Sequence, residues 1–291
     1  DDLLALGGTV LGTTNRLNPL NSPDGVARAM HNAQALGLDA LVAIGGDGTL
    51  TIAHALAERG LHVVGVPKTI DNDIEGCERS FGFDTAVSFA TECIDRLHST
   101  AESHQRVIVV EVMGRYAGWI ALHAGIAGNA HAILMPEIAF DLEKVAQKIQ
   151  TRDANGHLYS LVVVAEGAIA LNGERDVMAP AEDGHIERLG GIGEHVAKAL
   201  QASTGKDARA VVLGHLLRGG SPTAFDRLAA LRFGAAAVRA LHDGQRGIMV
   251  ALGSPGVTYV ALEEVAGRMK AVPLDGDTLR TGRDLGICFG D

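Results

Sequence analysis

The stretch ALVAIGGDGTL, residues 40–50, joins a short apolar run to a glycine-rich turn and then to the start of a helical segment. A continuous apolar run of this length is typical of a parallel strand that is covered on both faces. Glycines at the strand end let the backbone approach a ligand, and the free N–H groups at a helix start attract anionic oxygens. The motif therefore indicates either a phosphate-binding turn or a strand–turn–helix corner that merely needs glycine.

The same alternation of apolar runs and helical segments continues along the chain. Further strands are expected at 62–66, 107–112, 132–135, 160–165, 210–213 and 248–252, with helices at about 82–98 and 221–244. This order predicts an α/β fold with two doubly wound domains and mainly parallel sheets. In the second helix, Ser221 is the expected N-cap and Pro222 the first helical residue. The stripe expected to face its core is Phe225, Leu228, Leu231, Ala235, Val238 and Leu241.

Composition excludes several classes of protein. The 291 residues carry 25 Lys and Arg against 35 Asp and Glu, a net charge of −10, so no basic face for nucleic acid is expected. Three cysteines without a CxxC pair argue against a disulfide scaffold or a cysteine zinc site and fit a reducing compartment. No stretch of eighteen apolar residues suggests a membrane span, and the first residues, DDLL, lack the basic start of a signal peptide.

The segment PKTIDND, residues 67–73, carries two carboxylates two positions apart directly after a strand. One carboxylate can orient a metal ion while the other takes a proton from a hydroxyl. The alternative is an ordinary polar turn closed by an Asx hydrogen bond. In the preceding motif, Asp47 stands at a strand end, where it could hold Mg²⁺ directly or through water.

Three more segments place charged residues at strand ends or in turns. Arg115, in EVMGRYAGW (111–119), follows a strand and a glycine, where a guanidinium can reach a transferring phosphoryl group; its ordinary alternative is a surface ion pair. Glu166, in AEG (165–167), is more commonly a helix cap or ion-pair partner than a sugar ligand. His215 and Arg218 lie between glycines in GHLLRGGSP (214–222), and together they offer a hydroxyl partner and a phosphate clamp.

Taken in order, GGDGT, PKTIDND, SHQR, EVMGRYAGW, AEG and GHLLRGGSP resemble the 6-phosphofructokinase family, from Gly7 to about Arg232. The resemblance implies two Rossmann-like domains with the active site in the cleft between them. Residues 1–82 with 217–267 would bind the phosphoryl donor, and 83–216 with 268–291 would bind fructose 6-phosphate. It also implies a cytoplasmic, glycolytic kinase that uses Mg²⁺ and ATP and works as a homodimer or homotetramer.

The resemblance also implies a role for individual residues. Asp71 would be the general base for the 1-hydroxyl of fructose 6-phosphate, Thr69 would contact the same end of the sugar, and Arg115 would stabilise the migrating phosphoryl group. Asp47 and Asp73 would face Mg²⁺.

The binding residues that it implies form three sets. Those for the donor are Arg16, Gly46, Asp47, Gly48, Thr49 and Lys68. Those for the sugar phosphate are Met113, Gly114, Glu166, His215 and Arg218, with Arg106 and Arg209 supplied by a neighbouring subunit.

Two features bear on the choice of donor. Lys68 resembles the pyrophosphate-using branch of the family, whereas Gly48 resembles the ATP-using branch. An acidic side chain in place of Gly48 would repel or block an α-phosphate, so we expect ATP as donor, with a pyrophosphate-dependent 1-phosphotransferase as the alternative. His98 and His131 stand where regulated bacterial members carry an Arg and a Glu of the effector site, which predicts little nucleotide or phosphoenolpyruvate control.

The family begins with a strand and a glycine-rich loop of the type SGGDAPGMN, which this sequence does not contain. Without that unit we expect weak or no activity, and a degenerate, non-catalytic subunit is a further alternative. NAD kinases and lipid kinases share GGDGT, but they lack the TIDND and GHxxRGGSP segments in this order.

Overall fold

The computed structural model describes residues 2–14, 17–171, 173, 175, 177–179 and 188–291. The described residues form two compact units, the first made of residues 2–84 and 220–270 and the second of the remainder. The chain crosses from one unit to the other after residues 84, 219 and 270. The boundaries predicted from the sequence follow residues 82, 216 and 267. Which ligand each unit binds stays a proposal.

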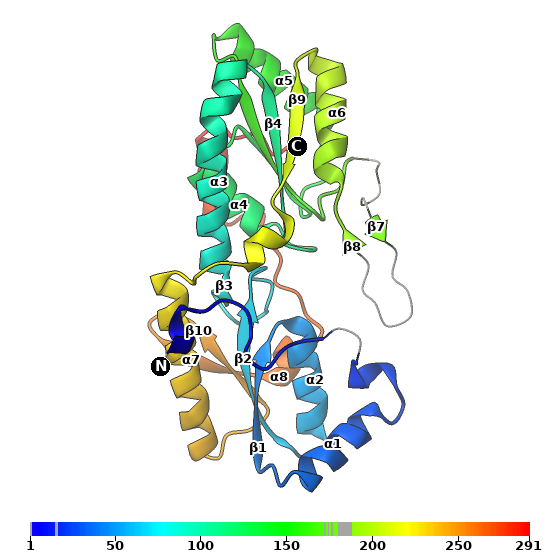
Figure 1. Ribbon diagram of the computed structural model, residues 1–291, viewed down its shortest axis with the longest axis vertical. Coiled ribbons are helices and arrows are strands. Elements are labelled where there is room, and N and C mark those ends of the chain that lie inside the picture. The colour runs from blue at the N-terminus through cyan, green and yellow to red at the C-terminus, as the bar shows by residue number, and fades with distance from the viewer. Residues whose placement is uncertain (1, 15–16, 172, 174, 176, 180–187) are drawn as a thin grey trace. The chain divides into compact units, whose positions relative to one another are not determined.

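The first unit is built on a sheet with the strand order β1-β2-β10-β11, with the short β3 also paired to β2. All pairs are parallel except β10–β11. Helix α7 packs on β2, β3 and β10, while α2 packs on β1 and β2 together with α8 (Figure 1). The strands are β1 (Ala40–Gly45), β2 (His62–Thr69), β3 (Phe81–Gly82), β10 (Ile248–Leu252) and β11 (Val257–Ala261); the helices are η1 (Asp2–Ala5), η2 (Pro19–Asn21), α1 (Gly25–Ala35), α2 (Asp47–Glu58), α7 (Ala224–His242) and α8 (Leu262–Val265).

The second unit has an all-parallel sheet with the strand order β5-β6-β4-β9. Every residue of β4 and β6 is buried, as expected for central strands covered on both faces. Figure 1 shows α6 on one side of this sheet and α3 and α4 on the other. The strands are β4 (Val107–Val112), β5 (Ala132–Leu134), β6 (Ser160–Ala165), β9 (Ala208–Val212) and the separate pair β7 (Val177–Ala179) and β8 (Arg188–Leu189); the helices are α3 (Phe83–His104), α4 (Trp119–Ala127), α5 (Leu142–Ala154), α6 (Ile192–Thr204), η3 (Gly214–Arg218) and α9 (Asp277–Asp284).

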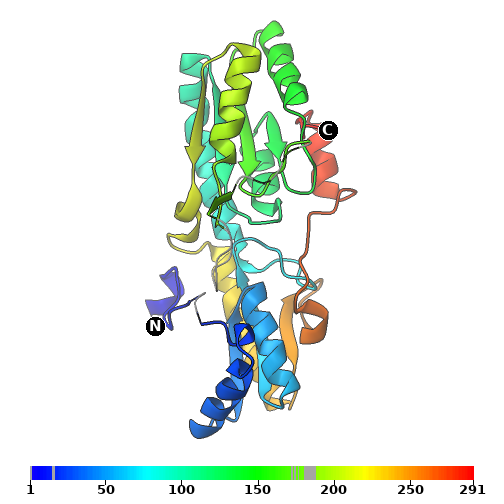
Figure 2. The same cartoon turned by 90° about the vertical axis from the view of Figure 1, so that its right-hand side faces the viewer.

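The predicted fold class is therefore confirmed, and each of the seven predicted strands is present with small shifts of its ends. Sequence reasoning missed β11, which is only partly buried and pairs antiparallel at the edge of the first sheet. In the second unit, the C-terminal segment runs beside β5, where Ile133 N donates to Cys288 O and Cys288 N donates to His131 O (Figure 2). No described helix is both long and apolar enough to cross a membrane.

The expected orientation of α7 is wrong. Phe225, Leu228, Leu231 and Val238 are 38–64% exposed, and the buried face consists of Asp226, Ala229, Phe233, Ala236, Ala237 and Ala240. Apart from Phe233, the buried face carries small alanine side chains, and most of the other large apolar residues lie on the opposite face. Of the predicted stripe, Leu241 does pack against the core. The N-cap is Thr223, which accepts from Asp226 N, whereas Ser221 donates to Ala5 O.

His98 and His131 lie together in the second unit. Their ring centroids are 6.2 Å apart, and both rings pack edge-on against Tyr159. His98 Nε2 donates to Gly128 O at 2.8 Å, and His131 Nδ1 accepts from Leu161 N at 2.9 Å. Burial, reinforced by the positive charge of Arg152, lowers the pKa of His131 to about 3.

This low pKa predicts a pH-dependent contribution to stability. In the unfolded chain a histidine binds its proton near pH 6.5, so the free energy of unfolding should fall as the pH drops from about 6.5 towards 3. His131→Asn keeps an acceptor for Leu161 N but cannot titrate there. Urea unfolding at pH 4 to 7 should give a shallower pH slope for this variant. His31→Asn, on an exposed position of α1, is the control for replacing a histidine at the surface. Parallel slopes for wild type and His131→Asn would contradict the assignment.

Candidate active site

The two motifs of the first unit lie side by side at the carboxyl ends of β1 and β2. The parallel register pairs Gly45 with Pro67, and a Cβ on Gly46 would lie 3.7 Å from Thr69 Cβ. A Cβ on Gly45 would lie only 2.3 Å from the Thr49 hydroxyl oxygen, so the turn requires glycine there. Helix α2 begins at Asp47 with no side-chain cap. Its first backbone N–H groups are thus open to an anionic ligand.

Asp71 is held in place by the turn that follows β2. The Thr69 hydroxyl donates to Asp71 Oδ2 at 3.2 Å and accepts from Asp71 N at 3.1 Å. Asn72 has a left-handed backbone with φ 55°, and its Oδ1 accepts from Ser80 N at 3.0 Å. Ser80 in turn donates to Thr69 O at 2.9 Å. These bonds fix a buried carboxylate, 7% exposed, close to the GGDG turn.

Lys270 is a residue of this region that sequence reasoning missed. Its backbone N donates to Asp73 O at 2.8 Å, and its Nζ donates to Cys77 O and Glu78 O at 2.6 and 3.1 Å. Burial lowers the pKa of Lys270 to about 8, against the opposing effect of nearby acidic groups that include Asp73. The side chain thus ties the 73–78 loop to a segment almost two hundred residues later in the sequence. No motif marks Lys270, because its partners are backbone carbonyls.

In the second unit, Glu166 holds the loop that carries Arg115. Its Oε1 accepts from Gly114 N at 3.3 Å and from Arg115 N at 3.0 Å. Arg115 has φ 52°, a left-handed conformation that a non-glycine residue seldom adopts without support. The register pairs Val112 with Ala165, so both motifs end at the same edge of the sheet. Glu166 is therefore a loop anchor here, in addition to the sugar contact expected of it.

A second carboxylate, Glu137, anchors the far end of the same loop. Its two oxygens accept from Gly118 N at 3.0 and 3.1 Å, and Oε1 also accepts from Val272 N at 2.9 Å. Glu137 thereby supports the start of α4 and ties the C-terminal segment to it. Sequence reasoning missed this residue, since its partners are again backbone groups that no motif records.

His215 and Arg218 lie in η3, which follows β9. Since β9 pairs parallel with β4, these residues lie at the same edge of the sheet as Met113 and Glu166. Both side chains are exposed. The second unit thus gathers Met113, Gly114, Arg115, Glu166, His215 and Arg218 at the carboxyl ends of three parallel strands, the usual place for ligands in open α/β sheets.

Arg106 and Arg209 are not part of that group. Arg106 precedes β4 and Arg209 is the second residue of β9, so both lie near the amino ends of these strands. Strand β4 has six residues at about 3.3 Å each, which puts roughly 17 Å between its two ends. Arg16, the arginine predicted to bind the phosphoryl donor, lies outside the described residues.

The predicted ligands of a metal ion, Asp47 and Asp73, would bind it through carboxylate oxygens. Among the described residues, no group of three or more His, Cys, Asp or Glu side chains could enclose a metal. Mg²⁺ is commonly bound by one or two carboxylates, with waters and substrate phosphates completing its shell. The half-buried Asp47 and the buried Asp73 are carboxylates of that kind, so the residues fit Mg²⁺ bound together with a phosphorylated substrate.

Comparison with known proteins decides the family. The phosphofructokinase family model matches residues 1–241. The chain belongs to the phosphofructokinase family. As a member it is a phosphotransferase of glycolysis. The chain is 51% identical to the ATP-dependent 6-phosphofructokinase of Chloroflexus aggregans, over 99% of this chain and 82% of that protein.

Other relatives differ in the donor that their names give. The chain is 52% identical to the pyrophosphate–fructose 6-phosphate 1-phosphotransferase of Streptomyces coelicolor, over 93% of this chain and 79% of that protein. The structure of phosphofructokinase from Saccharomyces cerevisiae matches 90% of this chain and 37% of its own, with a TM-score of 0.75 at 31% identity. Because ATP and pyrophosphate enzymes are equally similar, identity alone does not choose the donor.

Gly167 offers a test of the Arg115 loop. A Cβ at this position would lie 1.9 Å from Arg115 O, so an alanine must push the loop away. Gly167→Ala should lower the free energy of unfolding by about 1–3 kcal/mol, as other overpacking substitutions do. Gly234→Ala, where a Cβ meets no atom within 4 Å and the helix gains propensity, should not destabilise the protein. Equal stability of Gly167→Ala and wild type in urea unfolding would show that the loop is not held tightly.

Proposed function

We propose that the protein transfers the terminal phosphoryl group of ATP to the 1-hydroxyl of fructose 6-phosphate, giving fructose 1,6-bisphosphate. The observation that carries this proposal is the placement of Asp71. It is a buried carboxylate, fixed by Thr69, at the edge of the sheet where the GGDG turn opens a helix. A positioned base beside a phosphate-binding turn is what phosphoryl transfer to a hydroxyl requires.

The residues of the first unit serve the donor in this proposal. Gly46, Gly48 and Thr49 lie at the start of α2, where backbone N–H groups point towards the donor phosphates, and Asp47 and Asp73 hold Mg²⁺. The metal, when bound, neutralises charge that develops on the phosphates. A Cβ on Gly48 would meet no atom within 4 Å, so this position leaves open space for a nucleotide.

The residues of the second unit serve the sugar phosphate. Met113, Gly114, Glu166, His215 and Arg218 bind fructose 6-phosphate, and Arg115 faces the transferring group. The sugar 1-oxygen attacks the terminal phosphorus, its proton passes to the Asp71 carboxylate, and the bond to the leaving ADP oxygen breaks. Little covalent chemistry falls to the protein, so the fixed positions of Asp71 and Arg115 provide most of the catalysis.

Arg106 and Arg209 require a second copy of the chain. A hexose phosphate bound at the carboxyl end of β4 is too short to reach arginines at its amino end. We therefore propose that these arginines bind the 6-phosphate held by a neighbouring subunit in a symmetric homodimer or homotetramer.

Pyrophosphate is the alternative donor, and one observation favours it. Lys68 lies exposed at the end of β2, beside the GGDG turn, as in the pyrophosphate-using branch that the sequence resembles. An assay coupled to fructose 1,6-bisphosphate decides between the two, with Mg²⁺ and either ATP or pyrophosphate. ATP alone should support turnover. Turnover with pyrophosphate only would assign that donor. No turnover with either donor, by this chain and by a version with an SGGDAPGMN-type strand and loop added, would refute the proposed activity.

Asp71→Asn tests the general base. The amide keeps the size of the side chain but cannot take the hydroxyl proton, so kcat should fall about 10²- to 10⁴-fold while the KM for fructose 6-phosphate changes little. Asp39→Asn, an exposed position before β1, removes the same charge and should retain full activity. A rise in KM with an unchanged kcat would show that Asp71 binds substrate rather than accepting its proton.

Gly48→Asp tests the donor assignment. The open space at Gly48 admits the new side chain, and an acidic residue in the first turn of a helix is favourable, so the variant should fold. Its carboxylate would face the α-phosphate of ATP, which pyrophosphate lacks. The ratio of kcat/KM for ATP to that for pyrophosphate should drop about 10²-fold, as expected for two like charges a few ångströms apart. An unchanged ratio would remove Gly48 as the determinant.

A further inference from the structure

Asp207 joins the two arginines that lie at the amino ends of β4 and β9. Its Oδ1 lies 3.0 Å from Arg209 NH2, and its Oδ2 lies 3.4 Å from Arg106 NH2. Each carboxylate oxygen thus meets a different guanidinium group, and each guanidinium is met through one terminal nitrogen. The Arg106 side chain is 24% exposed and that of Arg209 is 62% exposed. Sequence reasoning singled out the two arginines but not the carboxylate between them.

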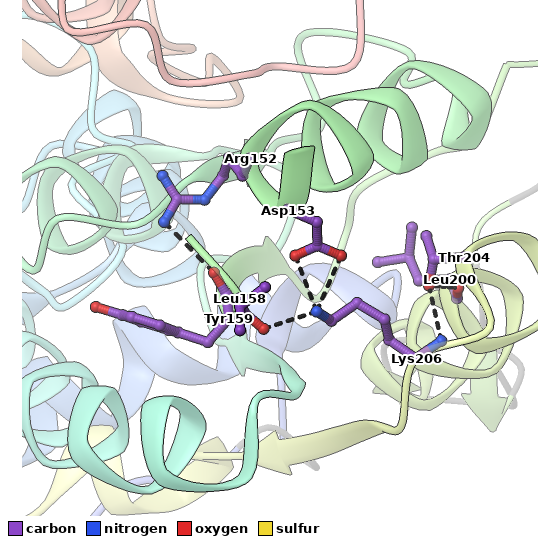
Figure 3. A network of polar contacts seen from close by, with 7 residues as sticks. All are labelled: Arg152, Asp153, Leu158, Tyr159, Leu200, Thr204 and Lys206. Carbon is purple, nitrogen blue, oxygen red and sulfur yellow. Dashed lines mark hydrogen bonds and ion pairs between the residues drawn. The ribbon is translucent and has the colours of Figure 1, made fainter. Parts of the chain in front are cut away.

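The backbone on both sides of Asp207 is fixed. Asp207 O accepts from Val107 N at 3.0 Å, and Ala208 N donates to Gln201 Oε1 at 3.2 Å. Lys206, directly before it, donates through Nζ to both oxygens of Asp153 at 2.8 and 2.9 Å and to Leu158 O at 2.7 Å, as Figure 3 shows.

The same figure shows that Lys206 N donates to the Thr204 hydroxyl, which caps the last turn of α6 by donating to Leu200 O. Arg152, next to Asp153 on α5, donates to Tyr159 O. The turn that carries Asp207 is therefore tied to α5, to α6 and to the start of β6. A carboxylate on such a turn has little freedom to follow a moving arginine.

The Arg106 and Arg209 guanidinium groups stay close to each other because the Asp207 carboxylate lies between them. Like charges repel, and long arginine side chains lose conformational entropy when they are ordered. An ion pair as exposed as that of Arg209 contributes little to folding stability, so its effect lies in where it holds the side chain. Terminal nitrogens that do not face Asp207 remain for a ligand, and two guanidinium groups side by side match a phosphate.

We propose that Asp207 is a positioning residue that holds Arg106 and Arg209 together as a preformed site for the 6-phosphate of fructose 6-phosphate. The inference rests on the proposed function, which assigns that phosphate to the two arginines. The two arginines then form a preorganised site. The conformational entropy of their side chains is lost during folding and not during binding.

Electrostatic potential and positioning predict opposite effects for the loss of this carboxylate. If Asp207 acted only through its charge, its removal would raise the positive potential and tighten the binding of a phosphate dianion. If it acts by positioning, its removal frees both arginines and weakens binding. The sign of the change in affinity therefore separates the two.

The experiment measures kcat, the KM for fructose 6-phosphate, and calorimetric binding of fructose 6-phosphate without donor. Asp207→Asn should raise both KM and the dissociation constant about tenfold while kcat stays within about twofold, since the arginines act on binding rather than on chemistry. Asp207→Glu, which restores the carboxylate, should recover part of this loss. Asp95→Asn, an exposed position on α3, is the matched control for the loss of one negative charge and should bind as wild type does.

Each outcome bears on a different claim. Tighter or unchanged binding by Asp207→Asn would overturn the positioning role. A lower kcat with an unchanged KM would assign Asp207 a merely structural part and would equally overturn it. A wild-type protein that neither binds nor phosphorylates fructose 6-phosphate would refute the proposed function itself, which distinguishes that failure from failure of the inference.

Discussion

Hydrogen bonds from backbone N–H groups to glutamate carboxylates, of which Glu111 and Glu166 are buried, are the interaction on which the loops of the second unit depend. Glu166 receives the N–H groups of residues 114 and 115, Glu137 receives that of Gly118, and Glu111 receives those of Gly191 and Gly193. A buried carboxylate is costly unless such donors surround it, and the loops in turn have no strand partner for these N–H groups. The loop N–H groups therefore stabilise the carboxylate, and the carboxylate provides the acceptors that these N–H groups lack. Loop and carboxylate are thus fixed together, and Arg115 can keep a left-handed backbone that it would not hold by itself.

Parallel strand pairing explains why the motifs that the sequence singled out lie together in each unit, while the roles given to their residues stay predictions. Motifs at the ends of β1 and β2, and of β4, β6 and β9, must meet at one edge of their sheets because the strands are parallel and in register. Apolar runs located those strands, whereas the grouping of Asp47 with Asp71, and of Arg115 with Glu166, came from the resemblance to the family.

The anchoring residues could not be found in the same way. Glu137 and Lys270 bind backbone atoms that are far away in the sequence, and Asp207 precedes a strand without belonging to any motif. The orientation of α7 failed for a different reason. This helix has apolar side chains on two faces, and the buried face carries Phe233 and several alanines, while Leu228, Leu231 and Val238 lie on the exposed face. Periodicity shows where apolar residues recur, but it does not show which of two apolar faces meets the sheet.

Arg115 lies at one end of β4, and Arg106 lies with Arg209 at the other end, which bears on how subunits would assemble. Arg115 follows the carboxyl end of this fully buried strand and Arg106 precedes its amino end, so folding of one chain holds them apart however the loops adjust. If fructose 6-phosphate binds beside Arg115, the Arg106–Asp207–Arg209 group of that chain faces no substrate of its own. A second copy, related by a twofold axis, can present the group to the first and receive the same in return. In that proposed arrangement the turn at Lys206, which is hydrogen-bonded to α5 and α6, sets the position of Asp207 beside the two arginines.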